Sequence, residues 1–164
     1  MTMPAMQGAD MEAVIAFWDE LADVGGQVSA AQYAVADIFE DIETLTKVVS
    51  STAVAPGAFD QRLADLKAEA FELEEALSGH KTKSEVGEYD IHRITSRLWH
   101  AYGGVANSSY GPTPSHRASL DQAREQFVPV KAAINRMLDV DLPQLRVDLQ
   151  EQNAPWGRGQ LIPD

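Results

Sequence analysis

Residues 28–49, VSAAQYAVADIFEDIETLTKVV, carry the pattern that decides the fold. Apolar residues recur there at alternating steps of three and four, namely Val28, Ala31, Val35, Ile38, Ile42, Leu45 and Val49. On an α-helix this spacing places them on one face, which we call an apolar seam. A single helix would leave this seam open to water, so the seam needs neighbouring helices that cover it.

Later segments repeat the same spacing over residues 58–78, residues 88–105 and the stretch that begins at Thr113. The connection between the first and second segments, residues 50–57, is short. A short connection brings consecutive helices together as antiparallel neighbours. We therefore expect an all-α fold, an up-and-down antiparallel four-helix bundle with a long first helix.

We expect the long first helix to kink or break at Gly25-Gly26. Upstream of the glycines the seam consists of Met11, Val14, Trp18 and Leu21, and Ile15 and Phe17 widen it. Two consecutive three-residue steps lead from this seam through Val24 toward Val28, which is a phase slip of the kind that distorts a helical bundle.

Single glycine, aromatic and proline residues give further expectations for the other three helices. Gly79 is expected to cap the second helix, because glycine readily adopts the left-handed conformation found at helix ends. In the third helix, Trp99 and Tyr102 are expected beside the inward face. Pro129 should bend the fourth helix, and Asp141-Leu142-Pro143 should kink or restart it, because proline lacks a backbone donor.

Three segments make up the expected domain organisation. Residues 1–8 are predicted to be a disordered lead, residues 9–152 the helical bundle, and residues 153–164 a C-terminal tail without periodicity. Neither a signal peptide nor a membrane-spanning segment is predicted, because no basic and apolar leader and no long apolar run occur. The compartment stays open, and it would be periplasmic if the chain came from an exported precursor.

The net charge of −12 is concentrated in the first half of the chain. Residues 1–80 contain 15 acidic and 3 basic residues, whereas residues 81–164 contain 10 of each. Binding to nucleic acid depends on Lys and Arg that neutralise phosphates, so this composition argues against a nucleic-acid partner. A solvated acidic face, or a face that meets a cationic partner, fits the first half.

The sequence offers no recognisable catalytic or metal-binding motif. There are no cysteines, which excludes disulfides and thiolate sites. The Glu-x-x-His pattern of di-metal bundles is absent, although Glu88 and His92 lie four residues apart and could share one ligand face. The acids fall at outward positions, where nothing would raise a pKa for glycosidase chemistry. We therefore expect no enzymatic activity and no cofactor.

A family resemblance rests on the last third of the chain. Its motifs are Pro112-Thr113, Ile134-Asn135, DLPQL at residues 141–145 and APWGRGQLIP at residues 154–163. These motifs resemble the C-terminal helical region of bacterial BNR-repeat proteins, which are sortilin-like β-propellers often labelled glycosyl hydrolases. Arg146 and Asn153 depart from the family pattern, and no propeller repeats occur in this chain.

The resemblance implies a non-catalytic scaffold or interaction module that belongs to a larger assembly. An accessory domain that packs against a propeller-type glycoside hydrolase is the alternative, and a metal-binding or small-ligand-binding bundle is a minor one. Within the tail, Trp156 either plugs the end of the bundle or anchors a protein partner, since Trp and Arg dominate interface energetics. The candidate partner contacts are Trp156, Arg158, Leu161 and Ile162.

Overall fold

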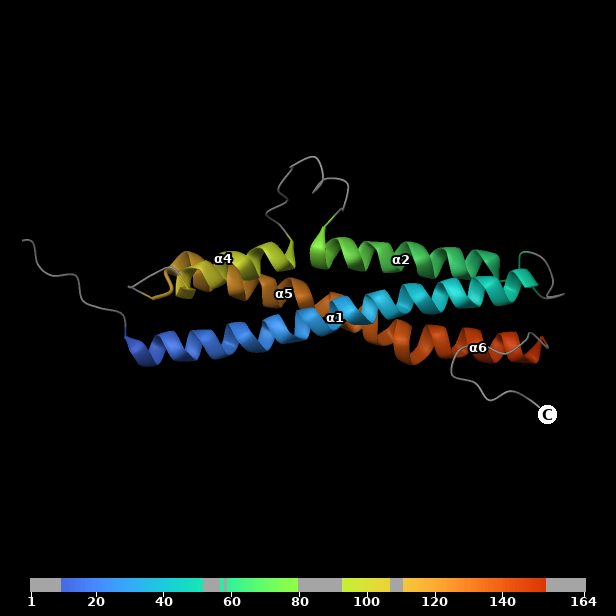
Figure 1. Cartoon of the computed structure of the whole chain (residues 1–164), viewed down its shortest axis with the longest axis horizontal. Coiled ribbons are helices and arrows are strands. Elements are labelled where there is room, and N and C mark those ends of the chain that lie inside the picture. The colour runs from blue at the N-terminus through green and yellow to red at the C-terminus, as the bar shows by residue number, and fades with distance from the viewer. Residues whose placement is uncertain (1–9, 52–56, 58, 80–92, 107–110, 153–164) are drawn as a thin grey trace, which may run out of the picture. The chain divides into compact units, whose positions relative to one another are not determined.

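The computed structural model describes residues 10–51, 57, 59–79, 93–106 and 111–152 (Figure 1). The helices in this part of the chain are α1 Met11–Ser51, α2 Asp60–Ser78, α4 Ile94–Ala106, α5 Pro114–Arg136, the π-helix η1 Met137–Asp141, and α6 Leu142–Glu151. The last three follow one another without a gap. No strand occurs among the described residues. The predicted all-α helical bundle is therefore confirmed.

The helices group into two compact units, and the long helices contribute to both. Unit 1 contains residues 11–30 of α1, the helix α4 and residues 114–128 of α5, together with the last turn of α2. Unit 2 contains residues 31–51 of α1, residues 60–75 of α2 and the helical stretch from Pro129 onward.

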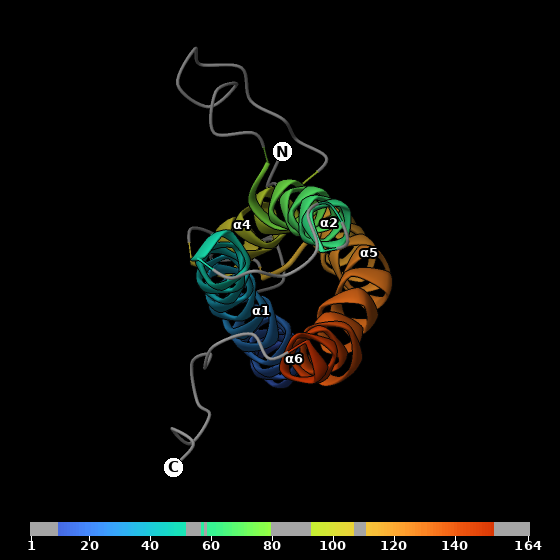
Figure 2. The ribbon, with the colours of Figure 1, turned by 90° about the vertical axis from the view of Figure 1, so that its right-hand side faces the viewer.

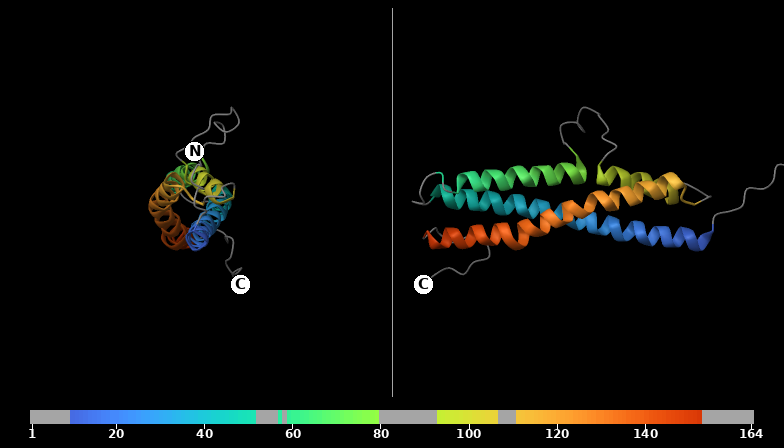
Figure 3. Two further views of the ribbon diagram at one scale, coloured as in Figure 1. Left: turned by 90° about the vertical axis from the view of Figure 1, so that its left-hand side faces the viewer. Right: turned by 180° about the vertical axis from the view of Figure 1, so that it is seen from behind.

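Unit 1 has a core that its helices share, and Figure 3 (left) shows α1, α4 and α5 around this common interior. The buried apolar residues are Phe17, Leu21, Val24 and Val28 of α1, Leu77 at the end of α2, Ile94 and Ala101 of α4, and Leu120, Ala123 and Phe127 of α5. Burial of this apolar surface is the main force that holds the helices of the unit together.

Unit 2 is built in the same way, and Figure 2 shows α1, α2 and α6 around its interior. Its buried apolar residues are Ala31, Val35, Ile38, Ile42 and Leu45 of α1, Phe59, Leu63, Ala70 and Leu73 at and within α2, and Val130, Ile134, Met137, Leu142, Leu145 and Leu149 of the last helical stretch. The seam predicted over residues 28–49 is therefore buried from Val28 to Leu45.

Helix α1 continues without interruption through Gly25-Gly26, so the predicted break is wrong. The helix stays continuous because Phe17, and not Trp18, belongs to the buried seam. Phe17 is fully buried and Trp18 is 41% exposed. With Phe17 in the seam, the steps from Phe17 through Leu21 and Val24 to Val28 are four, three and four, and they continue the downstream register without a slip.

The π-helix η1 accommodates an irregular step between two buried residues of the last helical stretch. Met137 and Leu142 are both buried although they are five residues apart, where the neighbouring steps are three and four. The Leu142 N–H donates to the carbonyl of Met137, a π-type hydrogen bond that accommodates one extra residue in the turn. The predicted irregularity at residues 141–143 is thus a local widening just before Pro143.

Gly79 ends α2 as predicted, with a left-handed φ of +79°. The Arg93 guanidinium completes this end, because Nη1 donates to the Ser78 carbonyl at 2.9 Å. The same guanidinium fills the space that a Cβ at position 79 would need. Glycine is therefore required at position 79 both by the backbone conformation and by the neighbouring side chain.

Candidate interaction surface

Large apolar side chains emerge from α1 next to its buried seam. Met11, Ile15 and Trp18 are separated by four and three residues, so they share one face of the helix. Their exposed fractions are 69%, 56% and 41%. Single exposed apolar residues are ordinary, but a series on one helical face in a stable fold indicates a surface available to a partner.

Helix α4 of the same unit adds two exposed aromatic residues to this surface. The rings of Trp18 and Tyr102 lie 5.6 Å apart between centroids and are tilted by 45°. Tyr102 in turn meets Trp99 edge-on at 5.5 Å, and Trp99 is 71% exposed. We call Trp18, Tyr102 and Trp99 with Met11 and Ile15 the aromatic surface.

Contact between the rings restricts the orientations of the three aromatic side chains. Rings at these separations and angles attract one another through their quadrupoles. Trp and Tyr also expose a large area while they lose little conformational entropy on binding. The aromatic surface therefore has the composition that interface hot spots favour.

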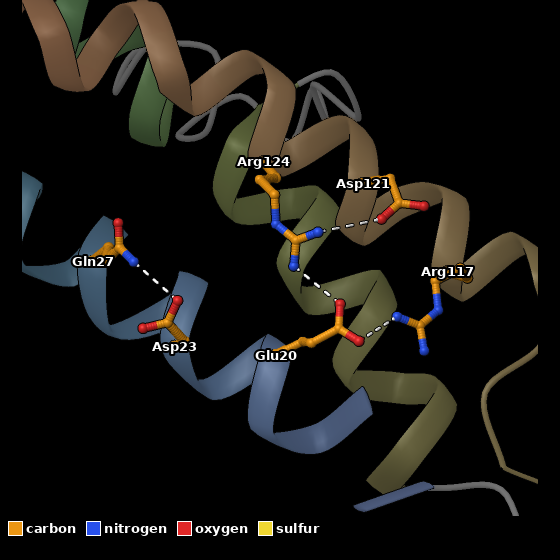
Figure 4. Close-up of polar contacts among 6 residues, drawn as sticks. All are labelled: Glu20, Asp23, Gln27, Arg117, Asp121 and Arg124. Carbon is orange, nitrogen blue, oxygen red and sulfur yellow. Dashed lines mark hydrogen bonds and ion pairs between the residues drawn. The ribbon is translucent and has the colours of Figure 1, made fainter. Parts of the chain in front are cut away.

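Glu20 fixes α1 to α5 within the same unit (Figure 4). Its carboxylate accepts a hydrogen bond from Arg117 Nη1 at 2.8 Å and another from Arg124 Nη2 at 3.0 Å. The two arginines, Arg117 first, lower the pKa of Glu20. Glu20 follows Trp18 by two residues, which is a turn of about 200° around the helix. The ion pairs therefore lie away from the aromatic surface.

Arg117 also packs over Phe17, the core residue that sets the register of α1. Its guanidinium carbon lies 4.6 Å from the centroid of the Phe17 ring, within the range of a cation–π interaction. One arginine thus connects the Glu20 carboxylate and the Phe17 ring. Since Phe17 precedes Trp18, this contact helps to hold Trp18 in its outward position.

The histidines His100 and His116 join α4 to the start of α5. Their rings lie 4.9 Å apart, and His100 Nε2 lies 3.1 Å from the Ser115 hydroxyl. His116 Nδ1 accepts a hydrogen bond from the Thr113 backbone N–H at 3.1 Å. The predicted helix start at Thr113 is confirmed, with His116 in the place of the usual capping carboxylate.

In unit 2, arginines pair with acids that the sequence placed on outward faces. Arg146 of α6 meets Asp41 of α1 at 2.7 Å, and Arg62 of α2 meets Asp148 of α6 at 2.5 Å. Arg62, followed by Gln144, lowers the pKa of Asp148. These pairs connect the acidic first half of the chain with the more basic second half.

Arg136 makes a further bridge in unit 2. Its Nε donates to Asp141 at 2.9 Å across the π-helix, and its Nη2 pairs with Glu69 of α2. Asp141 first and Glu69 next raise the pKa of this guanidinium. Part of the acidity of the first half is therefore neutralised within the molecule.

The sequence anticipated only part of the aromatic surface. Met11 and Trp18 were expected in the apolar seam, and both predictions are wrong because the two side chains are exposed and Phe17 occupies the seam. Trp99 and Tyr102 were placed beside the inward face, but neither is buried. Their positions outside the spacing of Ile94 and Ala101 were the available signal.

The partner contacts predicted in the tail, Trp156, Arg158, Leu161 and Ile162, lie outside the described residues. His92 and Glu88 lie outside them as well. Among the described residues, no group of three or more His, Asp or Glu side chains is placed to hold a metal ion. No described helix is both long and apolar enough to cross a membrane.

Comparison with protein-family models, with curated proteins and with solved structures finds no match to this chain. The resemblance to BNR-repeat proteins therefore stays a prediction from the sequence, and the aromatic surface has to be interpreted from its own chemistry.

Proposed function

We propose that this chain is a non-catalytic interaction module that binds another protein through the aromatic surface of unit 1. The observation that carries the proposal is the contact of Tyr102 with both Trp18 and Trp99 while each of the three remains at least 41% exposed. Aromatic residues that stay out of the core and support one another favour the binding of a protein face.

The pKa values of two interhelical carboxyl groups support a role without catalysis. A general acid needs a raised pKa, which burial provides. The carboxyl groups of Glu20 and Asp148 have lowered pKa values instead, because arginines donate to them. In this environment the carboxylates stabilise packing between helices and remain ionised.

Membership of a larger assembly is part of the same proposal. The propeller-associated role, whether as a scaffold or as an accessory domain of a glycoside hydrolase, comes from the predicted resemblance. A ligand-binding bundle comes from the general properties of helical bundles. No side chain in the described part of the chain favours either of these over a simple protein-binding module.

Photo-crosslinking at single positions of the full chain tests the proposal. The photoreactive amino acid p-benzoylphenylalanine replaces Trp99 in one variant and Tyr33, which is 76% exposed and lies in unit 2, in the control. We expect a specific crosslinked protein from position 99 in the native cell and none from position 33.

The captured protein is then purified and titrated against the chain. A complex of fixed stoichiometry that Trp99→Ala weakens roughly tenfold or more would support the proposal. Equal crosslinking at both positions, or a complex that Trp99→Ala leaves unchanged, would contradict it.

A further inference from the structure

We infer that the partner of the aromatic surface presents arginine or lysine side chains beside an apolar face. This inference rests on the proposed function and deepens it by naming the chemistry of the partner. It depends on the charges that border the aromatic surface and on the nature of its rings.

A row of acids borders the aromatic surface on α1. Glu12 follows Met11 and Asp19 follows Trp18, so each acid is turned by about 100° from the apolar face toward solvent. Asp23 continues this row one turn further, and the three side chains are exposed. We call Glu12, Asp19 and Asp23 the acidic rim.

No basic residue occurs in the part of α1 that carries this rim. Residues 10–30 contain five acids and neither lysine nor arginine. Of these acids, Glu20 is paired with two arginines of α5, whereas the rim lies on a different side of α1. The charge that α1 places beside the aromatic surface is therefore negative, and its side chains are exposed.

The rings of the aromatic surface are suited to the same kind of partner. Faces of Trp and Tyr attract cations, and the planar guanidinium of arginine stacks on them. Trp99, at 71% exposure, leaves most of its ring accessible to such a group. Neighbouring Arg or Lys side chains of one partner could thus make cation–π contacts with the rings and ion pairs with the acidic rim.

Charge also argues against a second copy of this chain as the occupant. The chain carries a net charge of −12, and a symmetric dimer on this surface would bring one acidic rim near the other. Like charges that face each other across an interface disfavour association. A partner with basic residues beside an apolar face is attracted by both the aromatic surface and the acidic rim.

The test titrates two synthetic amphipathic peptides of about 18 residues, or five helical turns, into the full chain. Both peptides have the same leucine face, and the other positions carry arginine in the basic peptide and glutamate in the acidic one. The chain carries Trp156→Phe, so that Trp18 and Trp99 are its remaining tryptophans and their fluorescence reports binding.

Matched variants separate the surface from the general acidity of the chain. Trp99→Ala should weaken the basic peptide roughly tenfold or more, whereas Phe71→Ala, an exposed aromatic residue of unit 2, should leave binding unchanged. Glu12→Gln with Asp19→Asn should weaken it roughly three- to tenfold. Asp37→Asn with Glu72→Gln changes the net charge equally in unit 2 and should change affinity less than twofold.

The inference stands if the basic peptide binds, the acidic peptide does not, and the variants follow this order. Equal binding of both peptides with loss in Trp99→Ala would overturn the cationic partner and leave the proposed function intact. Absent binding, or binding that Trp99→Ala does not change, would also overturn it, and photo-crosslinking would then decide the proposed function alone. Self-association that depends on Trp99, seen by sedimentation, would replace the partner by a second copy.

Discussion

The two units bury their cores in the same manner but differ in what surrounds those cores. In unit 1, Glu20 collects two arginines on one side of α1, and exposed aromatic rings meet on another. In unit 2, separate arginine bridges from Arg62, Arg136 and Arg146 join the helices. Unit 2 also has an aromatic pair, Phe39 with the exposed Phe71, but the ring contacts of unit 1 connect three exposed aromatic residues of two helices.

The units also differ in how regular their seams are. In unit 1 the spacing from Phe17 to Val28 is even, and α1 tolerates two adjacent glycines without a break. In unit 2 the spacing between Met137 and Leu142 is one residue too long, and a π-helix forms although no glycine is present. The spacing of buried residues therefore dominates over local helix propensity in both units.

The largest expected effect comes from changing the seam of unit 2 by one residue. Deletion of Gln144 forces Leu142, or Leu145 together with Leu149, out of the buried face. We expect a loss of about 3 kcal/mol or more in the free energy of unfolding, as for a large residue removed from a core. Urea unfolding followed by circular dichroism measures this loss.

Deletion of the exposed residue Val140 is the matched control for Gln144. It shortens the step from Met137 to Leu142 to four residues and keeps the leucines on one face. Both deletions are made with Pro143→Ala, because proline would burden a regular helix by about 3 kcal/mol. A stability of the Val140 deletion within about 1.5 kcal/mol of its Pro143→Ala parent is expected. Equal damage from the two deletions would refute the role given to the π-helix.

Glycine substitutions in unit 1 give an effect of intermediate size with opposite signs. Gly79→Ala should destabilise the chain by about 1–3 kcal/mol, because alanine is strained at a φ of +79° and its Cβ overlaps Arg93. Gly26→Ala should stabilise it by about 0.5–1 kcal/mol, since a Cβ there meets nothing within 4 Å in an unbroken helix. Thermal unfolding measures both, and destabilisation by Gly26→Ala would argue against the continuity of α1.

Glu20→Gln tests the arginine cluster of unit 1 through its pH dependence. The folded state lowers the pKa of Glu20 below its ordinary value of 4.5, so its ion pairs stabilise the fold above that pH. This stabilisation is lost as the pH falls from 4.5 through the lowered pKa. Because the side chain is 38% exposed, the difference between wild type and Glu20→Gln at pH 7 should be only about 0.2–1 kcal/mol.

Chemical denaturation at pH 7 and at pH 3 checks the Glu20 prediction. The gap between the two proteins should be smaller at pH 3, because below pH 4.5 the unfolded state takes up a proton more readily than the ion-paired carboxylate of the folded state. A gap that widens on acidification would show that the pairs with Arg117 and Arg124 do not act in this way.

Most of the fold followed from the sequence because apolar spacing is a local property. The seam residues from Val28 to Leu45 are buried as their spacing predicts. The register before the glycines was harder to predict, because two adjacent aromatic residues, Phe17 and Trp18, both fit a helical seam. Only the even spacing through Val24 to Val28 distinguishes them.

The aromatic surface could not be predicted in the same way, because it combines residues that lie far apart in the chain. Trp18 and Tyr102 belong to α1 and α4, and spacing within one helix does not reveal which outward residues of another helix they meet. The ion pairs of the arginines could not be predicted for the same reason. Arg117 and Arg146 find their carboxylates on α1 about 100 residues away, and these pairings depend on tertiary packing.

The most direct test of the binding role compares the exposed aromatic residues of the two units in one titration. Trp99→Ala and Phe71→Ala are each measured against the basic peptide, after thermal unfolding has shown that both remain folded. We expect Trp99→Ala to lose affinity roughly tenfold or more while Phe71→Ala binds as the unmodified chain does. Equal affinity of the two variants would contradict the assignment of binding to the aromatic surface.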